Sequence, residues 1–268
     1  MTGASAVRIG PRSALVLAVA SAAGLAMLCW PLLLRVSDGS RVDPPFLFLG
    51  LLPVVLAVVL AELSENGLDA RVLAVLGVLS AVNAILRGVS PGAAGVELTF
   101  FLLILAGRVF GPGFGFVLGC TSLFASALMT AGVGPWLPYQ MLCAAWVGMG
   151  AGLLPRRVGG RREIAMLAAY GVVSAYLFGL LMNLSGWPFL IGIVVPGHEG
   201  SLAYVAGAPV WENLRTFLVY TLLTSTAWDS LRALTNTVAI VLLGPAVLTT
   251  LRRAARRATV TGAVLTDR

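Results

Sequence analysis

The chain has 268 residues, of which 59% are hydrophobic and only 11% are charged, and its mean hydropathy is +0.95. It has too little polar surface to cover a soluble globule, so the composition indicates an integral membrane protein with one membrane domain. The formal charge of +7 comes from arginines that cluster at the ends of apolar segments. That pattern favours membrane orientation over binding of nucleic acid.

Apolar runs of helix length predict an all-α bundle, because only packed helices satisfy their backbone hydrogen bonds within a bilayer. The first run, residues 13–34, is interpreted as a retained helix and not as a signal peptide, since further apolar segments follow at once. The other predicted helices cover residues 46–61, 71–86, 98–107, 112–132, 138–154, 164–184 and 214–251. Residues 98–107 are short for a full membrane span.

The last apolar region, residues 214–251, is long enough for two crossings, but the charges favour one. If the arginine-rich turns at 156–162 and 252–257 both lie inside the cell, an even number of crossings separates them, and residues 164–184 supply one. Residues 211–227 then form an outer interfacial helix. The result is a bundle of about eight transmembrane helices with both termini cytoplasmic, and most of the arginines lie inside.

Few residues could support a metal site or catalysis. His198 is the only histidine, so a zinc site would need isolated acids or thiols. Cys29, Cys120 and Cys143 lie in apolar segments without a CxxC pair, which is typical of small buried residues. The chain has no lysine, so the GPGFG run at 111–115 is not a phosphate loop. HExxH, DxxxD and a Ser-His pair are also absent, so we predict no enzyme, metal or cofactor.

Three polar residues of the last helix, Asp229, Arg232 and Asn236, have i, i+3 and i+7 spacing and therefore share one helical face. Charged groups at membrane depth are costly and commonly face a cavity or a partner, which favours a functional site. The alternative is that Asp229 and Arg232 only pair with each other near the outer interface. The sequence leaves both interpretations open.

Other polar and aromatic residues converge on the outer side of the predicted bundle. Asn183 and Trp187 end the 164–184 helix, and Gln140 begins the 138–154 helix close to Trp136. Polar groups from three segments at one side are typical of an outward-facing small-molecule pocket. An aromatic belt is the alternative, but a belt should populate both membrane faces, whereas most tryptophans here fall at the outer one.

Stripes of small residues occur on several helices, and they favour close helix packing within the bundle or against a partner subunit. On the third predicted helix Gly77 is followed by Ala81, and Ser80 by Ala84. The first helix carries a longer stripe, which consists of Ala14, Ala18, Ala22 and Ala26.

Several sequence runs together resemble the substrate-binding S component of energy-coupling factor (ECF) vitamin transporters. They are LLILAGRVFGPGFGFVLG, Ser122 and Ser126 followed by GVGPWLPYQM, then GMGAGLLPRR, and finally WDSLRALTN with GPAVLTTLRRAARR. The resemblance implies a six-helix substrate-binding core over residues 71–257. Residues 1–70 are then an N-terminal extension of two helices, and residues 258–268 form a cytoplasmic tail.

The resemblance also implies a function: capture of a vitamin or related micronutrient outside the cell, and release inside through a coupling subunit and two ATPase subunits. Cobalamin or a precursor is the leading cargo, because the sequence looks most like the actinobacterial branch; a thiamine-like or flavin-like ring is the alternative. The protein is then a multi-pass bacterial cell-membrane protein. Matching positions for substrate contacts are Trp136, Gln140, Asn183, Trp187, Asp229, Arg232 and Asn236.

The resemblance implies that the first core helix docks on the coupling subunit through small residues, here Ala74, Gly77, Ala81 and Ala84. Val78 stands where an AxxxA face would repeat Ala74, so the stripe of the first helix is a rival docking face. A stand-alone secondary transporter that couples to protons through Asp229 remains the alternative function.

Overall fold

The computed structural model describes the chain over residues 11–33, 70–89, 96–190, 195 and 200–260. Within these ranges the regular elements are all helices, which confirms the predicted all-α class. The predicted helix at residues 46–61 and residues 261–268 of the predicted tail at 258–268 lie outside the described residues; residues 258–260 belong to the last described helix. Four of the described helices are long and apolar enough to cross a membrane: Ala70–Val89, Pro112–Met129, Arg161–Phe189 and Thr226–Arg257.

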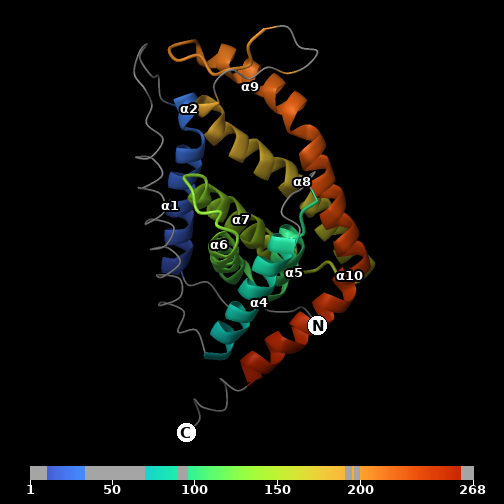
Figure 1. The fold of residues 1–268 in the computed structure, drawn as a ribbon. Helices are drawn as coiled ribbons and strands as arrows, with labels where there is room; N and C mark the ends of the chain where they lie inside the picture. Colours follow the sequence, from blue (N-terminus) through green and yellow to red (C-terminus); the bar gives the residue numbers. More distant parts are fainter. Residues whose placement is uncertain (1–10, 34–69, 90–95, 191–194, 196–199, 261–268) are drawn as a thin grey trace.

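The bundle consists of α4 (Ala70–Val89), α5 (Thr99–Phe110), α6 (Pro112–Met129), α7 (Leu137–Leu153), α8 (Arg161–Gly186) and α10 (Thr226–Val260). Short α5 lies at its centre and packs against all five of the others (Figure 1). Almost every residue of α5 is buried, including Arg108 in its last turn. Apart from Thr99 and Arg108 its sequence is apolar, because a helix surrounded by protein needs no polar face.

A tight turn joins α5 to α6. Gly111 has φ +108, a backbone conformation that favours glycine, and its N–H donates to the carbonyl of Gly107 at 2.9 Å. Pro112 then begins α6 at a position where a missing N–H costs nothing. The GPG run is therefore a helix-to-helix turn, as the sequence predicts.

The closest helix pair is α6 and α7, whose backbones touch at glycines. A Cβ atom added to Gly115 would lie 2.3 Å from the carbonyl oxygen of Gly148, and one added to Gly119 would lie 2.4 Å from the backbone nitrogen of Ala145. Side chains at these positions would force the helices apart. The small-residue stripe of α6 thus serves helix packing, as expected for membrane helices.

An ionic cluster joins several helices at the end of the bundle where α7 passes into α8. Arg108 donates to Glu163 at 2.8 Å, and to the backbone carbonyls of Leu154 and Val158. Arg252 of α10 contacts both oxygens of Glu163 at 2.7 and 2.8 Å. We call this end the arginine end, and the opposite end, where α4 ends and α10 begins, the site end.

The N-terminal helix α1 (Pro11–Leu28) packs on α7 and α8. Ser21 accepts a hydrogen bond from the Trp146 indole at 2.9 Å, and Gly24 lets the backbone of α1 meet the side chain of Leu142. The alanine stripe of α1 is on its other face, since Ala14 and Ala18, like Ala22 and Ala26, are exposed among the described residues.

The last apolar region forms two helices instead of one. Short α9 (Val210–Thr224) ends at Ser225, and α10 then runs along one side of the bundle and crosses beneath it toward the start of α4 (Figure 1). The expected interfacial helix at 211–227 corresponds to α9, but the membrane helix begins at Thr226 and not within 214–224. The last helix also ends later than the apolar run predicts, because α10 continues through its basic residues to Val260.

Candidate functional site

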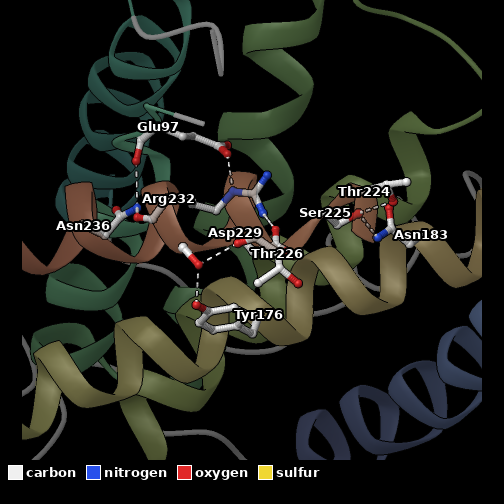
Figure 2. A network of polar contacts seen from close by, with 10 residues as sticks. Glu97, Tyr176, Asn183, Thr224, Ser225, Thr226, Asp229, Arg232 and Asn236 are labelled. Atoms are coloured by element: carbon white, nitrogen blue, oxygen red, sulfur yellow. Dashed lines mark hydrogen bonds and ion pairs between the residues drawn. The ribbon is translucent and has the colours of Figure 1, made fainter. Parts of the chain in front are cut away.

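A buried ion-pair network lies at the site end of α10. The Arg232 guanidinium donates through Nε to Glu97 at 2.7 Å and through Nη1 to Asp229 at 2.6 Å (Figure 2). Arg232 and Asp229 are only 7% and 4% exposed. Two carboxylates therefore share one guanidinium out of water, and the three side chains carry a net charge of −1.

Asn236 extends the same network by one helical turn. Its Nδ2 donates to the backbone carbonyl of Glu97 at 2.7 Å and to that of Arg232 at 2.9 Å. The i, i+3, i+7 face of α10 is thus buried inside the bundle, and it holds the chain in place directly before α5. The simple pairing of Asp229 with Arg232 does occur, but it is part of a larger network that includes Glu97.

Aromatic and small residues pack around Arg232 and Asp229. Its Cζ lies 5.9 Å from the ring centroid of Phe100 and 5.2 Å from that of Phe178, both in cation–π range. Gly179 of α8 lies directly against the Asp229 carboxylate, since a Cβ there would be 2.1 Å from Oδ2. The helices α5, α8 and α10 therefore leave this network little room to rearrange.

Two side-chain contacts join α8 to the first turns of α10. Asn183 donates to the hydroxyl of Ser225, and the Tyr176 hydroxyl lies 2.7 Å from that of Ser230 (Figure 2). Asn183 thus lies about one helical turn from Asp229 along the contact between α8 and α10. Its amide holds the junction of α9 with α10.

A second polar row joins α4 to α6 and α7. The Ser80 and Thr121 hydroxyls are 2.7 Å apart, and the Asn83 amide donates to Ser122 at 3.0 Å. One turn further on, Arg87 donates to the Ser126 hydroxyl and to the Gln140 Oε1, both at 3.1 Å. Gln140 is therefore connected to the site end by its hydrogen bond with Arg87.

The two tryptophans predicted to contact substrate have different environments. Trp187 is fully buried, donates to the Leu202 carbonyl at 2.7 Å, and packs among the rings of Tyr204, Phe217 and Tyr220. It forms the centre of a small cluster that joins the end of α8 to α9. Trp136, in contrast, is 50% exposed directly before α7.

Sequence reasoning missed Glu97, Asn83 and Arg87. Asn83 and Arg87 share a face of α4 with Ser80, so polar residues at helical spacing in an apolar run were the available signal. Glu97 follows the loop between α4 and α5, and only the fold shows that it meets α10.

The predicted docking residues of α4 fall on two faces. Ala74, Gly77 and Ala81 are exposed, whereas Ala84 is only 1% exposed and lies inside the bundle. Ala84 therefore cannot contribute to a docking surface on this face.

Nothing in the described part of the chain suggests a metal ion. It contains no group of three or more His, Cys, Asp or Glu side chains able to hold one, and its cysteines Cys29, Cys120 and Cys143 are free thiols.

A helical membrane bundle that buries charged residues is typical of a protein that binds or transports a solute. Residues 71–265 match the family model described as ECF transporter, substrate-specific component. This match covers more than half of the chain, so the chain belongs to that family, which comprises transporter subunits and not enzymes. It confirms the predicted family.

Members of this family are membrane proteins that bind a small-molecule substrate and associate with a coupling subunit and ATPase subunits. No curated protein and no solved structure matches the chain. Residues 1–70, which include α1, precede the matched region.

Proposed function

We propose that this chain captures a vitamin or related micronutrient outside a bacterial cell and releases it inside with a coupling permease and two ATPases. The observation that carries the proposal is the buried network of Glu97, Asp229, Arg232 and Asn236 at the site end, next to the polar pair of Arg87 and Gln140. Charged groups at membrane depth are costly to keep, so a buried network of two carboxylates, an arginine and an asparagine at the site end supports a binding function.

The arginine distribution supports an orientation with the site end outside. Arg157, Arg161, Arg162, Arg253 and Arg257 are exposed at the arginine end. By the positive-inside rule this end faces the cytoplasm. We therefore propose about eight crossings with both termini cytoplasmic, organised as a two-helix extension at 1–70, the binding core at 71–257 and a tail at 258–268.

The exposed small-residue face of α4 supports docking on the coupling subunit. Ala74, Gly77 and Ala81 let a partner helix approach the α4 backbone closely, and a Cβ added to Gly77 would meet nothing within 4 Å among the described residues. The face lies opposite the polar row that joins α4 to α6.

Cobalamin or a precursor is the first cargo to test, and the actinobacterial origin belongs to the same proposal. The side-chain oxygens of Asn83 and Asn236 are buried and accept no hydrogen bond from the described residues. Buried acceptors of this kind suit a cargo that carries several N–H donors, as the carboxamides of a corrinoid do.

The proposal is tested by purifying the protein in detergent and identifying the released ligand by mass spectrometry. A micronutrient should be retained without ATP, and uptake into liposomes should require the coupling and ATPase subunits. Uptake by this chain alone, driven by a pH gradient and abolished by Asp229→Asn, would instead establish a proton-coupled secondary transporter.

The site itself is tested with variants that keep the buried hydrogen bonds but remove the charges. The combined variant Glu97→Gln, Asp229→Asn, Arg232→Gln should fold, because the amides retain donors and acceptors, yet bind the ligand much more weakly. Arg215→Gln, on exposed α9, is the matched control. Unchanged affinity in the folded triple variant would contradict the assignment of this site.

A further inference from the structure

The two arginines of the site end differ in their partners. Arg232 donates to two carboxylates and lies between two aromatic rings. Arg87 is half-buried and donates only to neutral groups, the hydroxyl of Ser126 and the amide oxygen of Gln140. Among the described residues no carboxylate lies within ion-pair distance of Arg87.

The charges of the site end are therefore separated. Glu97, Asp229 and Arg232 together leave one negative charge on the α5 and α10 side. Arg87 places one positive charge on the α4, α6 and α7 side, where Glu97 acts on it only through longer-range attraction. Together these four described side chains are neutral, but their charges form a strong dipole.

Arg87 is also able to donate hydrogen bonds to a further partner. Hydrogen bonds to Ser126 and Gln140 orient the guanidinium, and its other N–H groups have no acceptor among the described residues. Because the Gln140 Oε1 accepts from Arg87, its NH2 group points elsewhere and is able to donate. A guanidinium with an adjacent amide donor matches the oxygens of a carboxylate or phosphate, with which arginine forms its strongest hydrogen bonds.

We propose that the substrate carries an anionic oxygen group, a carboxylate or a phosphate, and that Arg87 binds this group with Gln140 beside it. The proposal rests on the proposed function and adds the charge class of the cargo. The exposed ring of Trp136 lies one helical turn before Gln140, whose N–H donates to the Trp136 carbonyl at 3.0 Å. The anionic end of the substrate would thus bind at the start of α7, away from the negative side of the site.

The test uses matched pairs of compounds that differ in the anionic group. The pairs are nicotinate with nicotinamide, pantothenate with pantothenol, pyridoxine phosphate with pyridoxine, and cobinamide phosphate with cobinamide. Affinities are measured by isothermal titration on the full chain in detergent, for the wild type, Arg87→Gln, Arg87→Lys and the control Arg215→Gln.

The wild type should bind the anionic member of at least one pair more tightly than its neutral partner. Arg87→Gln should lose about 10- to 100-fold in affinity for that member alone, as expected for one or two charge-assisted hydrogen bonds. Arg87→Lys should keep the preference at lower affinity, and Arg215→Gln should match the wild type. The pairs also distinguish a carboxylate from a phosphate.

Three results would overturn the proposal. If the wild type binds a neutral member as tightly as its anionic partner, the charge class is wrong, although the proposed binding function stands. If a folded Arg87→Gln variant keeps the preference for the anion, Arg87 is a structural arginine. If the wild type binds no member of any pair and releases no micronutrient on denaturation, both this inference and the proposed function fail.

Discussion

The contact between Gly179 and Asp229 allows a sharp test of the buried network. A methyl group at residue 179 would lie 2.1 and 2.3 Å from the two carboxylate oxygens, so the carboxylate must move by more than 1 Å to restore van der Waals contact. That shift breaks its 2.6 Å hydrogen bond to Arg232. We expect Gly179→Ala to destabilise the protein.

The size of the effect follows from three contributions. Losing the charge-assisted hydrogen bond costs about 1.5–3 kcal/mol, and overpacking adds about 1–3 kcal/mol. The better helix propensity of alanine returns about 1 kcal/mol. The net loss of about 1.5–5 kcal/mol corresponds to a fall in Tm of about 3–20 °C for a chain of this size.

Thermal unfolding in detergent, followed by intrinsic fluorescence, measures this change. Gly186→Ala on the same helix is the matched control, because a Cβ there meets nothing within 4 Å, and its Tm should stay level or rise. In an Asp229→Ala background, Gly179→Ala should cost nothing further, since the obstructing carboxylate is gone. Equal losses in both backgrounds, or equal Tm values for the two alanine variants, would refute the contact as the cause.

Three further predictions concern the packing and the ionic cluster. Glu163→Gln removes the carboxylate that Arg108 and Arg252 share and should lower stability by about 3–5 kcal/mol in thermal unfolding, whereas Glu212→Gln on the surface should have no measurable effect. Gly115→Ala should prevent a monodisperse peak in size-exclusion chromatography, because the new methyl group meets backbone 2.3 Å away; Gly77→Ala, with nothing within 4 Å, should elute like the wild type. Trp187→Phe should cost about 1–3 kcal/mol, since it leaves the buried Leu202 carbonyl without its donor; a wild-type Tm would show that this hydrogen bond contributes little.

The sequence predicted the helices well where a single apolar run corresponds to a single helix, as for α6, α7 and α8. The expected interfacial helix at 211–227 corresponds to α9, but the sequence placed the start of the last membrane helix at 214 and not at Thr226, because α9 and α10 meet at Ser225 without a glycine, a proline or a charged turn to mark the break. The sequence also predicted that α5 is short but not that it lies at the centre of the bundle. That position depends on which helices surround it, which a single apolar run does not encode.

For the candidate site, the sequence identified the relations that lie within one helix. Asp229, Arg232 and Asn236 share a face because helical spacing fixes it. Glu97 and Arg87 were missed because their partners come from distant segments, and pairing between segments is not encoded in spacing. For Trp187 the sequence predicted only the position. A tryptophan near a helix end is expected at the membrane interface, but only the fold determines whether its ring faces a pocket or, as here, a buried core.

The backbone contact between α6 and α7 restricts where this protein can encode selectivity for its cargo. Along the line from Gly115 to Gly148 the two helices present no side chains to each other, and any residue larger than glycine would separate them. This pair thus offers no positions there at which a substitution could reshape a binding cavity. Within the core, changes of cargo during evolution or in engineering must therefore fall outside this contact line, for example on α4, α5, α8 and α10 or on the face of α6 that meets α4.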